Sequence, residues 1–108
     1  MKLLIPVEND CIAPRFDTAT DVLVATCYDQ KLIEEPRFLL LSDPSAEALC
    51  DMVLKERIQV VICCGIEEEH YSFLKWKKVT VLDSVIGRWQ AALDLAVYGT
   101  LEAGSILR

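Results

Sequence analysis

The sequence predicts an α/β fold, a three-layer sandwich around a five-stranded mixed sheet, with the element order β β β α β α β α. The first 41 residues contain three strand-like runs, the first two joined by a loop and the last two by a tight turn. After residue 43 the apolar residues recur with helical spacing instead. Two later runs are mostly apolar, which is typical of parallel strands covered on both faces. The later strands should therefore lie parallel to the first, with helices on both sides.

The amino-terminal part predicts an antiparallel meander. Residues 3–7 form an apolar run that reads as a buried strand, and a polar loop follows it. Residues 22–28 are rich in β-branched side chains and predict a second strand. A tight turn over residues 28–31 leads into a third strand over residues 32–41, part of which Pro36 confines to the sheet edge.

The rest of the chain alternates helices with strands. Asp43 can cap a helix with Pro44 at its first position. Residues 59–63 and 79–82 read as buried strands, with a short helix over residues 67–76 between them. Apolar stripes mark the first and last helices, and Gly99 ends the last one: Ala46, Leu49, Cys50, Val53 and Leu54; then Trp89, Ala92, Leu93, Ala96 and Val97.

Size and charge limit the classes of function. A chain of 108 residues can bury roughly two thirds of its surface, so residues 1–108 are expected to form a single domain. Its net charge of −6 disfavours nucleic acid and anionic lipid as partners. No apolar run is long enough to cross a bilayer, and the opening run is too short for a signal peptide. We therefore expect a cytoplasmic protein.

Five cysteines without the close spacing of a zinc or permanent iron-sulfur site indicate reduced thiols. Cys27, Cys50 and Cys63 fall at positions expected in the core. Ligands of open α/β sheets bind beyond the carboxyl ends of the parallel strands. The loops that leave those strands, residues 8–16, 64–67 and 83–87, should therefore meet at one rim of the sheet. The polar and thiol side chains on that rim are Asn9, Asp10, Cys11, Arg15, Cys64, Asp83 and Ser84.

Three segments resemble one family. Residues 13–19, Ala-Pro-Arg-Phe-Asp-Thr-Ala, resemble the Ser-Pro-His-Phe-Gly-x-Ala loop of the dinitrogenase iron-molybdenum cofactor biosynthesis family. Residues 60–66 look like that family's Val-Val-Ile-Cys-Gly turn, and residues 97–99 like its terminal Tyr-x-x-Gly. The family includes NifX, NafY and the carboxyl-terminal part of NifB. The resemblance implies a ribonuclease H-like fold and a non-enzymatic carrier of a metal-sulfur cofactor, with a donor or acceptor protein as partner.

The sequence departs from this family at the loop. Arg15 stands where the family has a histidine, and a guanidinium has no lone pair for a metal, so it can pair with an anionic cluster only electrostatically. Thiols offer a replacement, since thiolates bind iron and molybdenum-sulfur clusters well. We therefore predict Cys11, Arg15 and Cys64 as cofactor-binding residues and Cys11, Cys64 and His70 as metal ligands. The expected cargo is an iron-sulfur or iron-molybdenum-sulfur cluster.

Each of these residues has a structural alternative. Cys64 can be a buried core residue and His70 a solvated helix residue, whereas Arg15 can hold Asp17. Successive strand residues face opposite sides, so Cys63 and Cys64 cannot serve one site. Glutamates 67–69 at a helix start would repel an anion or simply be solvated.

Enzymatic activity is not expected. A two-metal nuclease needs carboxylates on the first strand, and residues 2–7 have none. A cysteine phosphatase needs an arginine where His70 stands, and a Cys64–His70 dyad lacks an orienting group. The alternative function is a cluster-free regulatory or scaffolding module, as a monomer or weak homodimer. Its apolar tail, Leu101, Ile106 and Leu107, would pack on its own domain or on a second copy.

Overall fold

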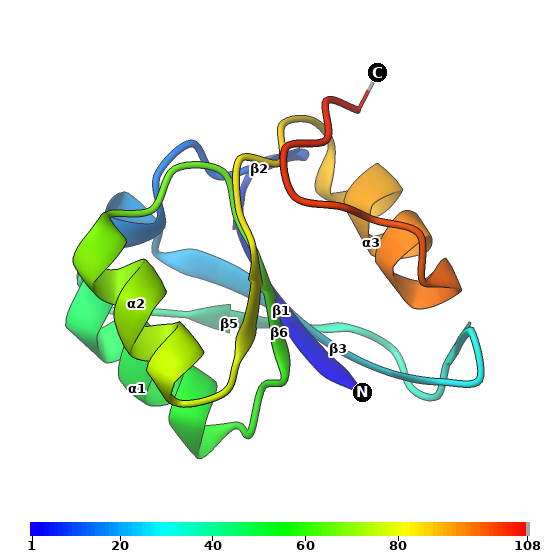
Figure 1. Cartoon of the computed structure of the whole chain (residues 1–108), viewed down its shortest axis with the longest axis horizontal. Coiled ribbons are helices and arrows are strands. Elements are labelled where there is room, and N and C mark those ends of the chain that lie inside the picture. Colours follow the sequence, from blue (N-terminus) through cyan, green and yellow to red (C-terminus); the bar gives the residue numbers. More distant parts are fainter. Residues whose placement is uncertain (108) are drawn as a thin grey trace.

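The computed structural model describes residues 1–107 and confirms a mixed α/β fold with a multi-stranded sheet between helices (Figure 1). No helix within this range is long and apolar enough to cross a membrane. The elements, in chain order, are β1 (Lys2–Glu8), β2 (Cys11–Ile12), the 3-10 turn η1 (Phe16–Thr18), β3 (Asp21–Tyr28), β4 (Lys31–Leu32), β5 (Arg37–Leu40), α1 (Ala46–Lys55), β6 (Val60–Ile62), α2 (Glu68–Trp76), β7 (Thr80–Leu82) and α3 (Trp89–Tyr98).

Strand β1 is the centre of the sheet. The main order is β4-β3-β1-β6-β7, with β2 added to β1 and β5 added to β3. Strand β1 runs antiparallel to β3 but parallel to β6, and β6 runs parallel to β7. The meander and the two parallel crossings expected from the sequence are therefore confirmed.

The strand count differs from the five expected. Residues 32–41 do not form one strand, because the chain leaves β3 after Leu32 and rejoins it at Arg37. Pro36 lies in this break and cannot donate a ladder hydrogen bond. In addition, Cys11 and Ile12, expected in a loop, pair with Glu8 and Val7. The described sheet therefore has seven strands, of which the additional strand β2 pairs with the central strand β1 and β5 pairs with β3.

The two faces of the sheet carry separate apolar cores. Helices α1 and α2 lie on one face and α3 on the other, as Figure 1 shows. Side chains of β1 alternate between them, since Leu4 belongs to the first core and Leu3 and Ile5 to the second. Phe16 of η1 is 1% exposed and belongs to the α1/α2 core. This alternation confirms the three layers.

The helix ends agree with the sequence in part. Gly99 ends α3 in the left-handed region, at φ 91°, as expected. The cap expected from Asp43 is wrong, because Ser45 is the N-cap of α1 and its Oγ accepts a hydrogen bond from the Ala48 amide at 3.1 Å. Ser45 has the extended backbone of a cap, and Pro44 lies before the helix rather than in it.

The carboxyl-terminal segment closes the α3 face. The Ile86 amide donates to the Ser105 carbonyl at 2.9 Å, and the Leu107 amide donates to the Ile86 carbonyl at 2.8 Å. Leu101 and Leu107 pack against the α3 core, whereas Ile106 is exposed. Gly87 allows this approach, since it has φ 136° and a Cβ there would lie 2.7 Å from the Leu107 Cβ. Two of the three apolar tail residues thus pack on their own domain.

Candidate functional site

The three loops at the carboxyl ends of β1, β6 and β7 meet in one rim, as expected. The Gly65 amide donates to the Pro14 carbonyl at 3.0 Å, and the Phe16 amide donates to the Gly65 carbonyl at 2.8 Å. The Ser84 amide donates to the Cys64 carbonyl at 2.8 Å. A Cβ on Gly65 would lie 2.8 Å from the Pro14 oxygen, so this close crossing requires glycine.

Arg15 is held by carboxylates next to it. Its Nε donates to Asp17 Oδ1 at 3.0 Å and its Nη2 to Asp17 Oδ2 at 2.7 Å, while Glu67 Oε1 lies 3.7 Å from Nη2. The hydrogen bond from Arg15 lowers the pKa of Asp17 below its ordinary value. Of the roles considered for Arg15, the structure shows the one in which it holds Asp17. Its charge is matched locally, which leaves little attraction for an anionic cluster.

The five thiols divide by exposure. Cys27, Cys50 and Cys63 are buried, which confirms their core positions, whereas Cys11 is exposed and Cys64 is half-buried. Burial, with a further contribution from Asp83, raises the pKa of Cys63 to about 12. Burial also raises the pKa of Cys50 to about 11, with Asp51 and Glu47 nearby. These two thiols stay protonated at neutral pH.

The predicted metal ligands point in different directions. Cys63 belongs to the α1/α2 core, and Cys64 packs against the α3 core, as the alternation along a strand requires. Cys11 precedes Ile12, which is buried in the α3 core, so the Cys11 side chain faces away from that core. His70 contacts Phe16 on the α1/α2 face, with 6.3 Å between ring centroids.

Cys11, Cys64 and His70 therefore do not form a ready set of three ligands. Among residues 1–107, one group of three possible metal ligands has its ligand atoms within 4.8 Å of one another. Its members are Glu67, Glu69 and His70. His70 Nε2 lies 3.5 Å from Glu69 Oε1. The loops converge as predicted, but the ligating role of the thiols stays a prediction.

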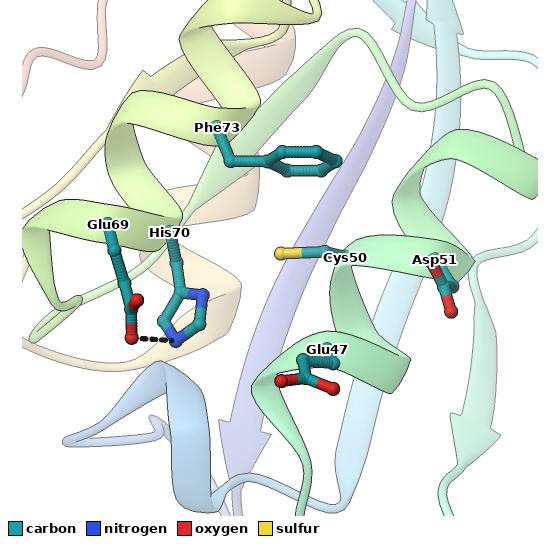
Figure 2. Close-up of a pocket in the computed structure, with 6 residues that line it drawn as sticks. All are labelled: Glu47, Cys50, Asp51, Glu69, His70 and Phe73. Carbon is teal, nitrogen blue, oxygen red and sulfur yellow. Dashed lines mark ion pairs between the residues drawn. The ribbon is translucent and has the colours of Figure 1, made fainter.

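A pocket between α1 and α2 was not expected from the sequence. Figure 2 shows the Cys50 sulfur and the Phe73 ring directed into it, with the Glu47 and Glu69 carboxylates below them in this view and Asp51 farther along α1. Its volume is about 300 Å³. Glu47, Cys50 and Asp51 share one face of α1 through their helical spacing, as do Glu69, His70 and Phe73 on α2, but the sequence does not show that the two faces meet. The lining residues are Glu47, Cys50, Asp51, Glu69, His70 and Phe73.

Solved structures share this architecture over nearly the whole chain. The crystal structure of PH0822 matches with a TM-score of 0.82 and 15% sequence identity, covering 95% of this chain and 94% of that one. A proposed dinitrogenase from Methanocaldococcus jannaschii matches with a TM-score of 0.76 and 22% identity, covering 94% and 92%. A proposed NifB protein from Thermotoga matches with a TM-score of 0.70 and 17% identity, covering 99% and 97%.

At such identities the likeness establishes the fold alone. No protein-family model matches the sequence. No curated protein matches it either.

Proposed function

We propose that this protein binds or carries a metal-sulfur cofactor, of the iron-sulfur or iron-molybdenum-sulfur type, in nitrogenase-related cofactor biosynthesis or a paralogous pathway. The observation that carries the proposal is the shared fold, over more than nine tenths of the chain, with proteins described as a proposed dinitrogenase and a proposed NifB. The sequence motifs that resemble the cofactor biosynthesis family lie on the rim and on α3 of this fold. The cluster would be cargo, passed between a donor and an acceptor protein.

Cys11 is the best-placed ligand for such cargo. Its thiol is exposed on the rim, whereas Cys64 is half-buried against the α3 core. We propose that Cys11 holds the cluster and that the half-buried Cys64 is its second ligand. Arg15, already paired with Asp17, would contribute little.

We further propose that the protein has no catalytic activity of its own. The Cys64–His70 dyad considered from the sequence finds its two side chains packed against different cores, Cys64 on the α3 face and His70 on the α1/α2 face. A nucleophile and its base need hydrogen-bond reach. This separation supports a carrier rather than an acyl-transfer enzyme.

Anaerobic reconstitution with ferrous iron and sulfide tests the carrier proposal. We expect bound iron and visible charge-transfer absorption in the wild type. Cys11→Ser and Cys64→Ser should each lower bound iron by roughly half or more, because each removes one of two thiolate ligands. Cys27→Ser, which alters a buried thiol on β3, is the matched control and should load like the wild type. Equal loading of all three variants would refute the rim site.

Arg15→His tests the same proposal by adding a metal ligand instead of removing one. The substitution removes the pairing with Asp17 and supplies an imidazole that can ligate a metal. We expect tighter cluster binding than in the wild type, measured by competition with a chelator. Unchanged or weaker binding would argue against a cluster beside residue 15.

The alternative is a cluster-free interaction module, which exposed apolar residues at the sheet edge favour. Phe38 and Leu40 on the edge strand β5 are 59% and 76% exposed. Edge strands with apolar side chains pair readily with another chain. Light scattering over a range of concentrations would show whether the protein dimerises without a cluster.

A further inference from the structure

We propose that the pocket between α1 and α2 binds a short aliphatic diamine, with one ammonium group against the carboxylates of α1 and the other against the carboxylate of α2. This site lies on the face opposite the α3 core and is independent of the proposed cofactor rim. The argument rests on the chemistry of the two helical walls, on the apolar floor between them, and on the balance of charge around the opening.

The walls are acidic on both helices. Glu47 and Asp51 lie one helical turn apart on α1, and Glu69 lies at the start of α2, where Figure 2 shows it beside His70. All three carboxylates are exposed. A ligand with a positive group at each end matches negative groups on opposing walls.

The floor is apolar. Cys50 is 5% exposed and its sulfur points into the pocket, next to the half-buried ring of Phe73 (Figure 2). Among residues 1–107 no hydrogen bond ties up this thiol. Methylene groups of a ligand would cover the sulfur and the ring, which are the surfaces that water solvates least. Lys77 Nζ already lies 5.8 Å from the centre of the Phe73 ring, so the ammonium groups of a ligand would be held by the carboxylates rather than by this ring.

The charge around the pocket favours a cation and disfavours an anion. The titratable groups that line it are the three carboxylates, the His70 imidazole and the protonated Cys50 thiol, and no lysine or arginine of the described chain is among them. A volume of about 300 Å³ is at the small end of the range for ligand pockets. A small dication therefore fits better than a nucleotide or a phosphorylated sugar.

A bare metal ion fits less well. Cys50 does not belong to the group of donors within 4.8 Å of one another, which is Glu67, Glu69 and His70. Glu67 is not among the lining residues of the pocket, and its carboxylate lies 3.7 Å from the Arg15 guanidinium, which competes with a metal ion for it. The pocket itself therefore offers a metal ion only Glu69 and His70 on α2, without Glu67 as the third close donor.

Titration with putrescine at low ionic strength, followed by amide NMR shifts, tests the proposal. We expect saturable shifts confined to α1 and α2, and none with butanediol, which has the same chain without charge. The double variant Glu47→Gln/Asp51→Asn should weaken binding by roughly threefold or more. Asp94→Asn on α3, also an exposed helical carboxylate, is the matched control and should bind like the wild type.

Three results would overturn the proposal. Equal shifts with butanediol would show that charge is not recognised. Equal weakening by Asp94→Asn would show a diffuse attraction to an acidic surface rather than a site. Zinc-induced shifts in α1 and α2 without any putrescine response would assign the pocket to a metal ion. None of these results bears on cluster loading at the rim, so the two proposals fail separately.

Discussion

The two faces of the sheet are closed in different ways. On one face two helices lie side by side over β1 and its neighbours, and their side chains leave a pocket between them. On the other face a single helix, α3, is completed by the carboxyl-terminal segment, which is tied down by backbone hydrogen bonds to Ile86. Side chains of different lengths leave gaps that a ligand can fill, whereas a hydrogen-bonded segment fits closely. The first face therefore keeps a pocket between its helices, and the second has a cover held by backbone hydrogen bonds.

The largest loss of stability should come from substituting Phe16, whose ring is buried in the α1/α2 core next to the rim. Phe16→Ala removes a ring that is 1% exposed and should lower the free energy of unfolding by about 3–5 kcal/mol, measured by chemical denaturation. Phe38→Ala, at a ring that is 59% exposed, should cost less than about 1 kcal/mol. Similar losses for the two variants would mean that the rim loop does not seal this face.

A smaller loss of stability should come from substituting Gly87, because the carboxyl-terminal segment that closes the α3 face packs directly against it. Gly87→Ala places a Cβ 2.7 Å from that of Leu107 at a φ of 136°, so we expect a loss of about 1–3 kcal/mol. The released segment should also be cleaved faster by proteases. Gly99→Ala, at φ 91° with open space around it, should cost about 1 kcal/mol without faster cleavage. Unchanged cleavage of Gly87→Ala would show that the cover does not depend on this approach.

The smallest change in stability should appear at alkaline pH, through the Cys63 thiol, which is buried in the α1/α2 core. Folding raises the pKa of Cys63 from 9.0 to about 12, so the folded state holds a proton that the unfolded state loses. Stability from this group is complete below pH 9 and falls as the pH rises above it, by up to about 1.4 kcal/mol per pH unit. Cys63→Ala should make the stability profile less steep between pH 9 and 11, and Cys50, whose pKa is raised to about 11, should account for slope that remains.

Val61→Ala is the control for lost packing in this experiment. Val61 is buried two residues before Cys63 on the same strand face, and it does not titrate. Its substitution should lower stability equally at every pH and keep the alkaline slope of the wild type. A wild-type slope in Cys63→Ala would show that other groups cause the alkaline loss.

Local patterns predicted most of the fold. The apolar stripes of α1 and α3 and the apolar runs of β6 and β7 depend on burial alone, and the structure places them as expected, except that Leu54 of the α1 stripe is exposed. The misses lie where two local signals competed. Both Asp43 and Ser45 are residue types that favour the N-cap position of a helix. The extended backbone at Ser45 makes this residue the N-cap of α1. Pro36 signalled an edge strand, but not that the strand would break into β4 and β5.

The candidate sites were predicted less completely, because they depend on contacts between distant segments. Strand topology alone brought the rim loops together, and the Arg15–Asp17 pair could be proposed from two nearby residues. The direction of Cys11 depended on its unexpected pairing with Glu8. The pocket needed the distance between α1 and α2, which no periodicity within either helix contains.

The placement of the two chain ends has a practical consequence for immobilisation. The Met1 amino group donates to the Cys27 carbonyl at 2.7 Å, at the end of β1 farthest from the rim, whereas Leu107 lies beside the loop of residues 83–87 (Figure 1). An affinity tag fused ahead of Met1 would leave the rim open to an incoming protein. A tag fused behind the carboxyl-terminal segment would stand next to the rim and crowd any protein that docked there. Biosensor tests of the proposed cargo transfer should therefore anchor the molecule by its amino end.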